Sequence, residues 1–240
     1  MEKRFWEIDF LRGFAVVMMI IYHLFFDLSY FGYFNINSAF WWWLAHVIAT
    51  IFIFLVGISL SLSFSRTKKI RMPTKEIRKK YLRRGLKIFS LGMIITLITW
   101  IFMRKGFVLF GVLHLIGVSI ILAYPFLKLR FPNLILGITF ISLGLYMKNF
   151  TFDFPWLLWA GFMPHHFYTI DYFPILPWFG VVLIGLFFGN LLYPNYQRIV
   201  NLPEDDFITK RFFCFLGRNS LPIYLLHQPI LITILYFLIV

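Results

Sequence analysis

An apolar segment near the N-terminus carries titratable side chains where a membrane helix rarely tolerates them. Residues 10–30 are long enough to cross a bilayer, which takes about 20 mostly apolar residues. Ionisable groups at or inside such a segment are costly, so they indicate a functional path by default. Four of them share one stripe of the predicted helix, at about 100° per residue: Asp9, Arg12, His23 and Asp27. We therefore predict a polar path with Arg12 at one end and His23 and Asp27 toward the other.

The rest of the chain has the composition of an integral membrane protein. Hydrophobic residues make up 60% of the 240 residues and charged residues only 14%, which is far from a soluble domain. Long apolar windows, rather than alternating ones, predict an all-α polytopic transmembrane bundle that forms a single domain over residues 1–240. About seven spans are expected, at 10–30, 40–64, 85–103, 108–127, 132–147, 174–192 and 220–240.

The positive charge is distributed in a way that predicts topology. Of 23 Lys and Arg residues, eleven fall between Arg66 and Lys87, so residues 65–84 are expected to form a basic cytoplasmic loop that touches anionic lipid headgroups. The resulting bias places the N-terminus in the cytoplasm and the C-terminus outside. A net charge of +13 concentrated between two spans does not indicate a nucleic-acid partner. One cysteine excludes an internal disulfide framework.

His23 and Asp27 stand four residues apart, which allows the carboxylate to hydrogen-bond the imidazole across one helical turn. A carboxylate partner fixes the tautomer of a histidine and raises its basicity, as general-base catalysis requires. The same pair could instead serve as polar glue between helices. Spacing alone leaves these two interpretations about equally favoured.

Three further motifs carry polar residues into or beside the apolar segments. His114 lies between Gly111 and Gly117, and such small residues allow a neighbouring helix or a ligand to approach closely. Asp171 precedes the sixth span. Arg218 opens the last one, where its planar fork of donors suits a phosphate, although a plain positive-inside anchor explains it as well.

Two of these motifs resemble parts of a known superfamily. The sequence Asp9-x-x-Arg12-Gly13, with His23 eleven residues after the arginine, resembles the first helix of the membrane acyltransferases that modify cell-surface sugars. Residues 216–229, LGRNSLPIYLLHQP, resemble the late helix of that superfamily. Within it, residues 7–32, 111–117 and 171–180 are most similar to prokaryotic members of the heparan-α-glucosaminide N-acetyltransferase catalytic-domain family.

The resemblance implies a multi-pass acyltransferase of the cell membrane. Acetyl-CoA or another acyl-CoA would bind from the cytoplasm, and a carbohydrate or lipid-linked acceptor would approach from outside. CoA phosphates would be bound by Arg12, Arg84 and Arg218. His23, backed by Asp27, would act as general base, with His114 as an alternative, and direct transfer and an acyl-histidine route both remain open.

On the acceptor side, the resemblance implies roles for Asp171 and His227. It implies neither a metal nor a haem. Seven spans are fewer than the ten or so usual in the superfamily, so a homo-oligomer in which a second subunit supplies the missing helices is one arrangement to consider.

Other functions are compatible with the same residues. A transporter or flippase for a small or lipid-linked anionic molecule would also use intramembrane His and Asp with a basic mouth. A b-type haem protein could use two of His23, His46 and His114 as axial ligands. A retinal protein is disfavoured because the last span has no lysine for a Schiff base.

Overall fold

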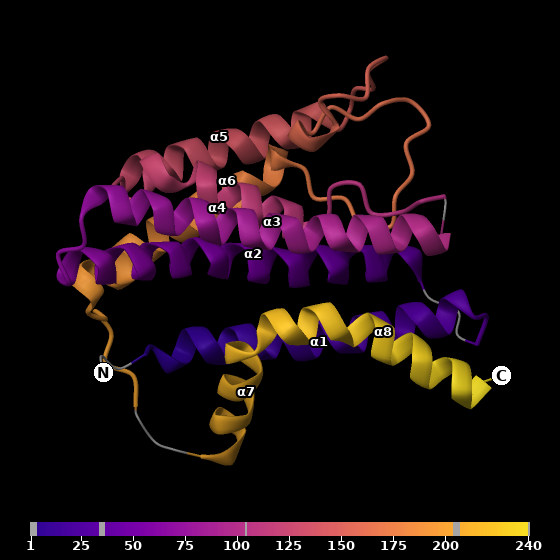
Figure 1. The fold of residues 1–240 in the computed structure, drawn as a ribbon, viewed down its shortest axis with the longest axis horizontal. Helices are drawn as coiled ribbons and strands as arrows, with labels where there is room; N and C mark the ends of the chain where they lie inside the picture. Colours follow the sequence, from indigo (N-terminus) through magenta and orange to yellow (C-terminus); the bar gives the residue numbers. More distant parts are fainter. Residues whose placement is uncertain (1–3, 34–36, 104, 204–206, 240) are drawn as a thin grey trace. The chain divides into compact units, whose positions relative to one another are not determined.

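A computed structural model describes residues 4–33, 37–103, 105–203 and 207–239 of the chain. Across these residues the regular secondary structure is helical, with two isolated bridges and no strand. The α-helices are α1 (Trp6–Tyr30), α2 (Ser38–Lys69), α3 (Thr74–Met103), α4 (Val112–Leu122), α5 (Phe131–Met147), α6 (Ile175–Leu192), α7 (Ile208–Arg218) and α8 (Ser220–Ile239) (Figure 1). The predicted all-α class is confirmed.

Each of the seven predicted spans contains an apolar helix, but the helices differ in length. Among the described residues, five are long and apolar enough to cross a membrane, namely α1, α2, α3, α6 and α8. The other two, α4 and α5, are shorter. With 11 residues, α4 rises only roughly 16 Å, about half of a hydrocarbon core. The predicted span at 108–127 is therefore a short helix followed by a 3₁₀ turn at Tyr124–Phe126.

The basic segment at 65–84 is mostly helical, and this corrects the predicted loop. Helix α2 continues to Lys69 and α3 begins at Thr74, so only residues 70–73 form the turn. Lysine and arginine are good helix formers, and charge alone does not interrupt a helix. The sequence interpretation also did not include α7, a short amphipathic helix directly before the last span.

The chain divides into two compact units, whose boundary falls within α2. The first unit comprises Met1–Phe52 and Leu202–Val240, and the second comprises Ile53–Asn201. Within the first unit, α1 packs against both α7 and α8 (Figure 1). Gly13 and Gly217 lie where α1 and α7 meet: a Cβ on Gly13 would stand 1.9 Å from the carbonyl oxygen of Phe213. The two backbones are in direct contact there.

Glycines also set the helix contacts of the second unit. Between α2 and α6, a Cβ on Gly185 would stand 2.2 Å from the carbonyl oxygen of Phe54. A hydrogen bond of 2.6 Å from Ser61 Oγ to Asn190 Oδ1 links the same two helices. Helix α6 packs against α5, and α3 packs against α4. This unit positions the loop that carries Asp171.

Candidate functional site

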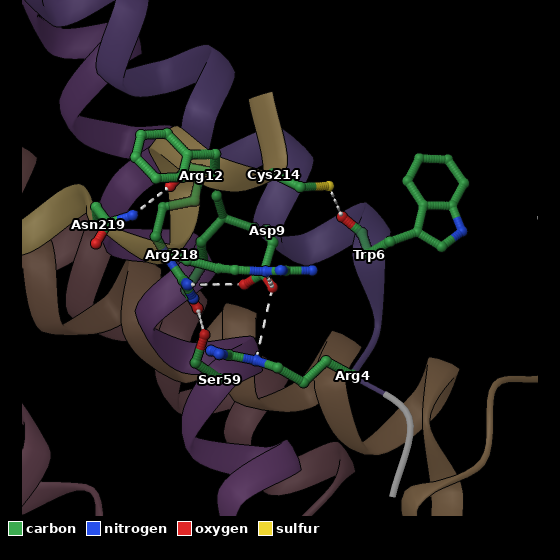
Figure 2. A network of polar contacts seen from close by, with 10 residues as sticks. Arg4, Trp6, Asp9, Arg12, Ser59, Cys214, Arg218 and Asn219 are labelled. Carbon is green, nitrogen blue, oxygen red and sulfur yellow. Dashed lines mark hydrogen bonds and ion pairs between the residues drawn. The ribbon is translucent and has the colours of Figure 1, made fainter. Parts of the chain in front are cut away.

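Asp9, near the start of α1, is the centre of an arginine cluster. The aspartate is 4% exposed. Arg12 Nη1 donates to Asp9 Oδ1 at 3.4 Å, and Arg218 Nε donates to Asp9 Oδ2 at 3.3 Å. Arg4 Nε lies 3.6 Å from the same Oδ2, and Figure 2 shows the three arginines converging on the carboxylate. The sequence placed Arg12 and Arg218 near one mouth of the bundle; the structure shows that they share one counter-ion.

One further cation, Lys210, and one further carboxylate, Glu7, lie on the same helices as this arginine cluster. Lys210 Nζ lies 4.0 Å from the centre of the Trp6 ring, and Glu7 is buried in the first turn of α1. Cys214 Sγ donates to the carbonyl oxygen of Trp6 at 3.4 Å. Burial, assisted by the neighbouring Asp9, raises the pKa of the Cys214 thiol. Four cations around two carboxylates leave an excess of positive charge, which suits a phosphate-bearing ligand.

Two histidines meet further along α1. The rings of His23 on α1 and His227 on α8 are in edge-to-face contact, with centroids 4.6 Å apart. His23 Nδ1 lies 2.8 Å from the carbonyl oxygen of Met19, and His227 Nδ1 lies 2.7 Å from that of Tyr224. A carbonyl oxygen only accepts, so each Nδ1 carries the hydrogen of the neutral ring. Each Nε2 is then left as a lone-pair acceptor.

Asp27 lies one turn after His23 on α1, and Gln228 directly follows His227 on α8. Gln228 Nε2 donates to Asp27 Oδ1 at 2.7 Å. Three side-chain atoms here are buried without a hydrogen-bond partner: Asp27 Oδ2, Gln228 Oε1 and His227 Nε2. Asp27 is 5% exposed and His227 is 8% exposed. We call these four residues, His23, Asp27, His227 and Gln228, the histidine cluster.

The histidine cluster differs in its bonding from the sequence prediction. Asp27 was expected to bond His23 across one turn, but His23 bonds the Met19 carbonyl and Asp27 bonds Gln228. Gln228 was overlooked, although it directly follows His227 within the motif of the last span. Its pairing with Asp27 joins residues 201 positions apart, which no local pattern reveals.

An apolar hollow adjoins the histidine cluster. It measures about 290 Å³ and is lined by Ile20 of α1 and by α8 residues that include Ile223, Leu226 and Leu231. His227 also lines it. A narrow, largely apolar ligand in this hollow would therefore reach one ring of the histidine pair.

His114 lies in the second unit and has a different environment. It is 1% exposed. The N–H of Gly111 donates to His114 Nδ1 at 3.2 Å, so Nε2 carries the ring hydrogen and faces Thr96 Oγ1 at 3.3 Å. Both ring nitrogens are thus engaged in closing the first turn of α4 and in joining it to α3.

Asp171 caps the same helix from the loop before α6. The N–H of Val112 donates to Asp171 Oδ2 at 3.2 Å. A Cβ at residue 111 would stand 2.0 Å from that oxygen, so a larger residue there would displace the carboxylate. Burial raises the pKa of Asp171 to about 6, and the hydrogen bond from Val112 opposes that rise. The carboxyl group is therefore poised to change protonation under mildly acidic conditions.

Arg84, the remaining predicted phosphate ligand, lies on α3 in the second unit. Among the described residues it has no ion pair with a carboxylate. One turn earlier, Lys80 Nζ donates to Ser63 Oγ at 2.9 Å. A hollow of about 510 Å³ at the α2–α3 turn is lined by one acidic residue, Glu76, and by four basic ones: Arg71, Lys79, Lys80 and Arg83.

None of the described His, Cys, Asp and Glu side chains form a group of three or more that could hold a metal ion. The chain is a helical membrane protein in which α1 carries part of an arginine cluster, shared with α7, and part of a buried histidine cluster, shared with α8. Its sequence matches the heparan-α-glucosaminide N-acetyltransferase catalytic family over residues 4–229, and the chain belongs to that family. Family membership makes it an acetyltransferase of a membrane-bound class. Curated proteins and solved structures gave no match.

Proposed function

We propose that this protein transfers an acyl group, most simply acetyl, from cytoplasmic acyl-CoA to a sugar-like or lipid-linked acceptor at the outer face of the cell membrane. The observation that carries the proposal is the state of His23. Its Nδ1–H is committed to the Met19 carbonyl, which leaves Nε2 as a base, and its ring contacts that of His227, whose own Nε2 is buried without a partner. A base needs such a lone pair directed toward the proton it removes.

The arginine cluster supplies the donor end of the proposed site. Asp9 holds Arg12 and Arg218 in fixed orientations, and a guanidinium can bind a phosphate through two parallel hydrogen bonds. The excess of positive charge would attract the phosphates of CoA. Arg84 belongs to the second unit and is included as a CoA ligand because of the family resemblance. The hollow at the α2–α3 turn, in the same unit, is a second basic surface that could bind a phosphate.

In the proposed reaction His23 Nε2 removes a proton from the amine or hydroxyl of the acceptor. The freed electron pair attacks the thioester carbonyl carbon, and the C–S bond breaks once the new C–N or C–O bond has formed. The proton passes from His23 to the departing sulfur, which leaves as the CoA thiol. His227, in ring contact with His23, would hold the base in place.

His114 is less suited to the role of base, because both of its nitrogens are already hydrogen-bonded. Asp171 would act on the acceptor side by keeping the N-terminus of α4 and the adjoining loop in place. An acetyl group carried briefly by His23 is an alternative route. It would reveal itself as a covalent adduct after rapid quenching with acetyl-CoA in the absence of acceptor.

The first test is the thermal stability of the detergent-purified protein with and without acetyl-CoA. A ligand that binds only the folded state stabilises it by about 2.7 kcal/mol at a hundredfold excess over Kd. For a chain of this size that corresponds to a rise in Tm of roughly 5–10 °C. We expect Arg12→Ala to lose the shift and His23→Ala to keep it while losing turnover by about 10²-fold or more.

Lys148→Ala, a basic residue outside both clusters, is the matched control for Arg12→Ala and should keep the full shift. The absence of a shift with acetyl-CoA, free CoA and longer acyl-CoAs would contradict the proposal and favour the transporter instead. Release of CoA in detergent, where no compartments remain, separates the same two functions.

A further inference from the structure

The histidine cluster contains more unpaired acceptor atoms than the proposed transfer alone requires. We propose that Asp27 Oδ2, Gln228 Oε1 and His227 Nε2 form the recognition site for the acceptor substrate. This site would bind only groups that donate hydrogen bonds. The inference rests on the proposed acyl transfer, and it assigns a role in specificity to Gln228.

The first step of the argument is the cost of leaving these atoms unpaired. Buried polar atoms in native proteins nearly always have a partner in the protein, in ordered water or in a ligand. Each exception costs about 1–3 kcal/mol. Three exceptions lie on three residues of two packed helices, and Gln228 and Asp27 are themselves joined by a 2.7 Å hydrogen bond. Such a concentration indicates a ligand that completes them.

The second step is that all three atoms are hydrogen-bond acceptors. A carboxylate only accepts, so the amide of Gln228 must direct its NH₂ toward Asp27 and leave its oxygen free. His227 gives its hydrogen to the Tyr224 carbonyl, which leaves its Nε2 as an acceptor. His23 has the same arrangement through Met19. With Asp27 ionised, the unpaired atoms offer lone pairs and no hydrogens.

The third step is the chemical class of the ligand. The carbonyl oxygen of a thioester is itself an acceptor, so it gains nothing from these atoms and is repelled by them. A hydroxyl or amine brings the hydrogens they lack. A buried site built to bind such hydrogens rejects an analogue without them by up to about 10⁴–10⁵-fold, because its own polar groups would stay unpaired. The residues beside the base would thus select the nucleophile.

The most direct test replaces one hydrogen-bond acceptor, Asp27 Oδ2, with a donor. Asp27→Asn can still accept from Gln228 through its amide oxygen, but it presents an NH₂ where Asp27 Oδ2 stood. Gln228→Met keeps the length of the side chain and removes both its donor and its free oxygen. Thr233→Val on α8 is the matched control, because its hydroxyl only bonds the carbonyl of Pro229 on its own helix.

Steady-state CoA release would be measured with acetyl-CoA and glucosamine as the acceptor probe, alongside the Tm shift given by acetyl-CoA alone. We expect Asp27→Asn and Gln228→Met to raise the KM for glucosamine by about 10-fold or more, the effect of one lost hydrogen bond to a buried group. Both variants should keep the acetyl-CoA shift. Thr233→Val should match the original protein in KM and in the shift.

Two kinds of failure are distinguishable. If the unsubstituted protein shows neither the shift nor transfer, the proposed function itself is wrong. If it transfers acetyl groups and Asp27→Asn leaves the KM unchanged, the recognition site is overturned, and the unpaired atoms hold only a buried water. Should Asp27→Asn not fold, Gln228→Glu replaces it. Its carboxyl can share one proton with Asp27 and still present a free oxygen, so it should restore the KM that Gln228→Met has lost.

Discussion

Two histidines of this chain, His23 and His114, both lie in apolar segments but have very different hydrogen bonding. His23 uses one ring nitrogen and His114 uses both. We expect His114→Ala to leave the N–H of Gly111 and the hydroxyl of Thr96 without their partner, which costs about 1–3 kcal/mol. His23→Ala should cost little stability and most of the turnover. Tm and CoA release, measured on both variants, give the comparison. A larger Tm loss for His23→Ala would contradict it.

Asp171 gives the chain a predicted pH dependence. Its pKa lies at about 6 in the folded protein against an ordinary value of 3.8. Between these values the folded protein keeps a proton that the unfolded chain releases, so stability falls as pH rises from about 4 to 6. We expect this fall to be on the order of 1–2 kcal/mol, after allowance for partial exposure.

Asp171→Asn is the natural comparison, because the amide still accepts from Val112 but does not titrate. Tm should be followed from pH 4.5 to pH 7 for both proteins. The difference in Tm between them should change up to about pH 6 and become constant above it. Parallel curves throughout the range would show that Asp171 is not the responsible group.

At the residue scale the sequence singled out titratable residues in the apolar segments but did not predict their hydrogen-bond partners. The intramembrane His23, Asp27 and His227 were identified because charged and titratable side chains are conspicuous in an apolar helix. Their partners were not, because Gln228 is a neutral side chain and its contact with Asp27 depends on how α1 packs on α8. The hydrogen bond from His23 to the Met19 carbonyl could not be predicted either, because side-chain spacing does not reveal bonds to the backbone.

At the scale of helices, the contact between α1 and α7 depends on two glycines. A Cβ on Gly13 or Gly217 would stand within 2 Å of a backbone carbonyl oxygen on the other helix. Backbone cannot move aside as a flexible side chain does, so we expect Gly13→Ala to separate the helices and cost about 1–3 kcal/mol or more. Leu11→Ala, an exposed position on the same helix, is the control.

Cys214 offers a direct readout of that separation. It is the single cysteine of the chain, it is buried, and its thiol donates to the Trp6 carbonyl on α1. Alkylation by a maleimide should be slow in the original protein and in Leu11→Ala, and distinctly faster in Gly13→Ala. Equal rates in all three proteins would mean that α1 and α7 stay in contact despite the added methyl group.

Helix identity was predictable here and helix ends were less so. Long apolar runs specify α1, α2, α3, α6 and α8 directly. Charge was a poor guide, because the basic residues of 65–84 continue α2 and begin α3 instead of forming a loop. The amphipathic α7 is too short, and carries too many basic residues, for a hydropathy window to detect it.

At the scale of the whole molecule, the charge distribution predicts sidedness. We expect a C-terminal epitope to react with antibody on intact cells. We also expect a cysteine placed in the α2–α3 turn, Met72→Cys in a Cys214→Ser background, to react with a membrane-impermeant maleimide only after permeabilisation. The opposite pattern at both sites would reverse the topology and contradict the proposed cytoplasmic position of the arginine cluster.

Helix α1 has one further consequence, because it carries both Asp9 and His23. A helix is a stiff rod with a fixed rise, so fourteen residues place the centre of the arginine cluster roughly 21 Å from the base. In the proposed reaction α1 would therefore act as a molecular ruler between the phosphate-binding arginines and the base. A donor that satisfies both ends must have its anionic group and its reactive carbon separated by about this length. Acetyl donors much shorter than this span would reach the base only without the arginines, and the ruler would exclude them without any contact to the acetyl group itself.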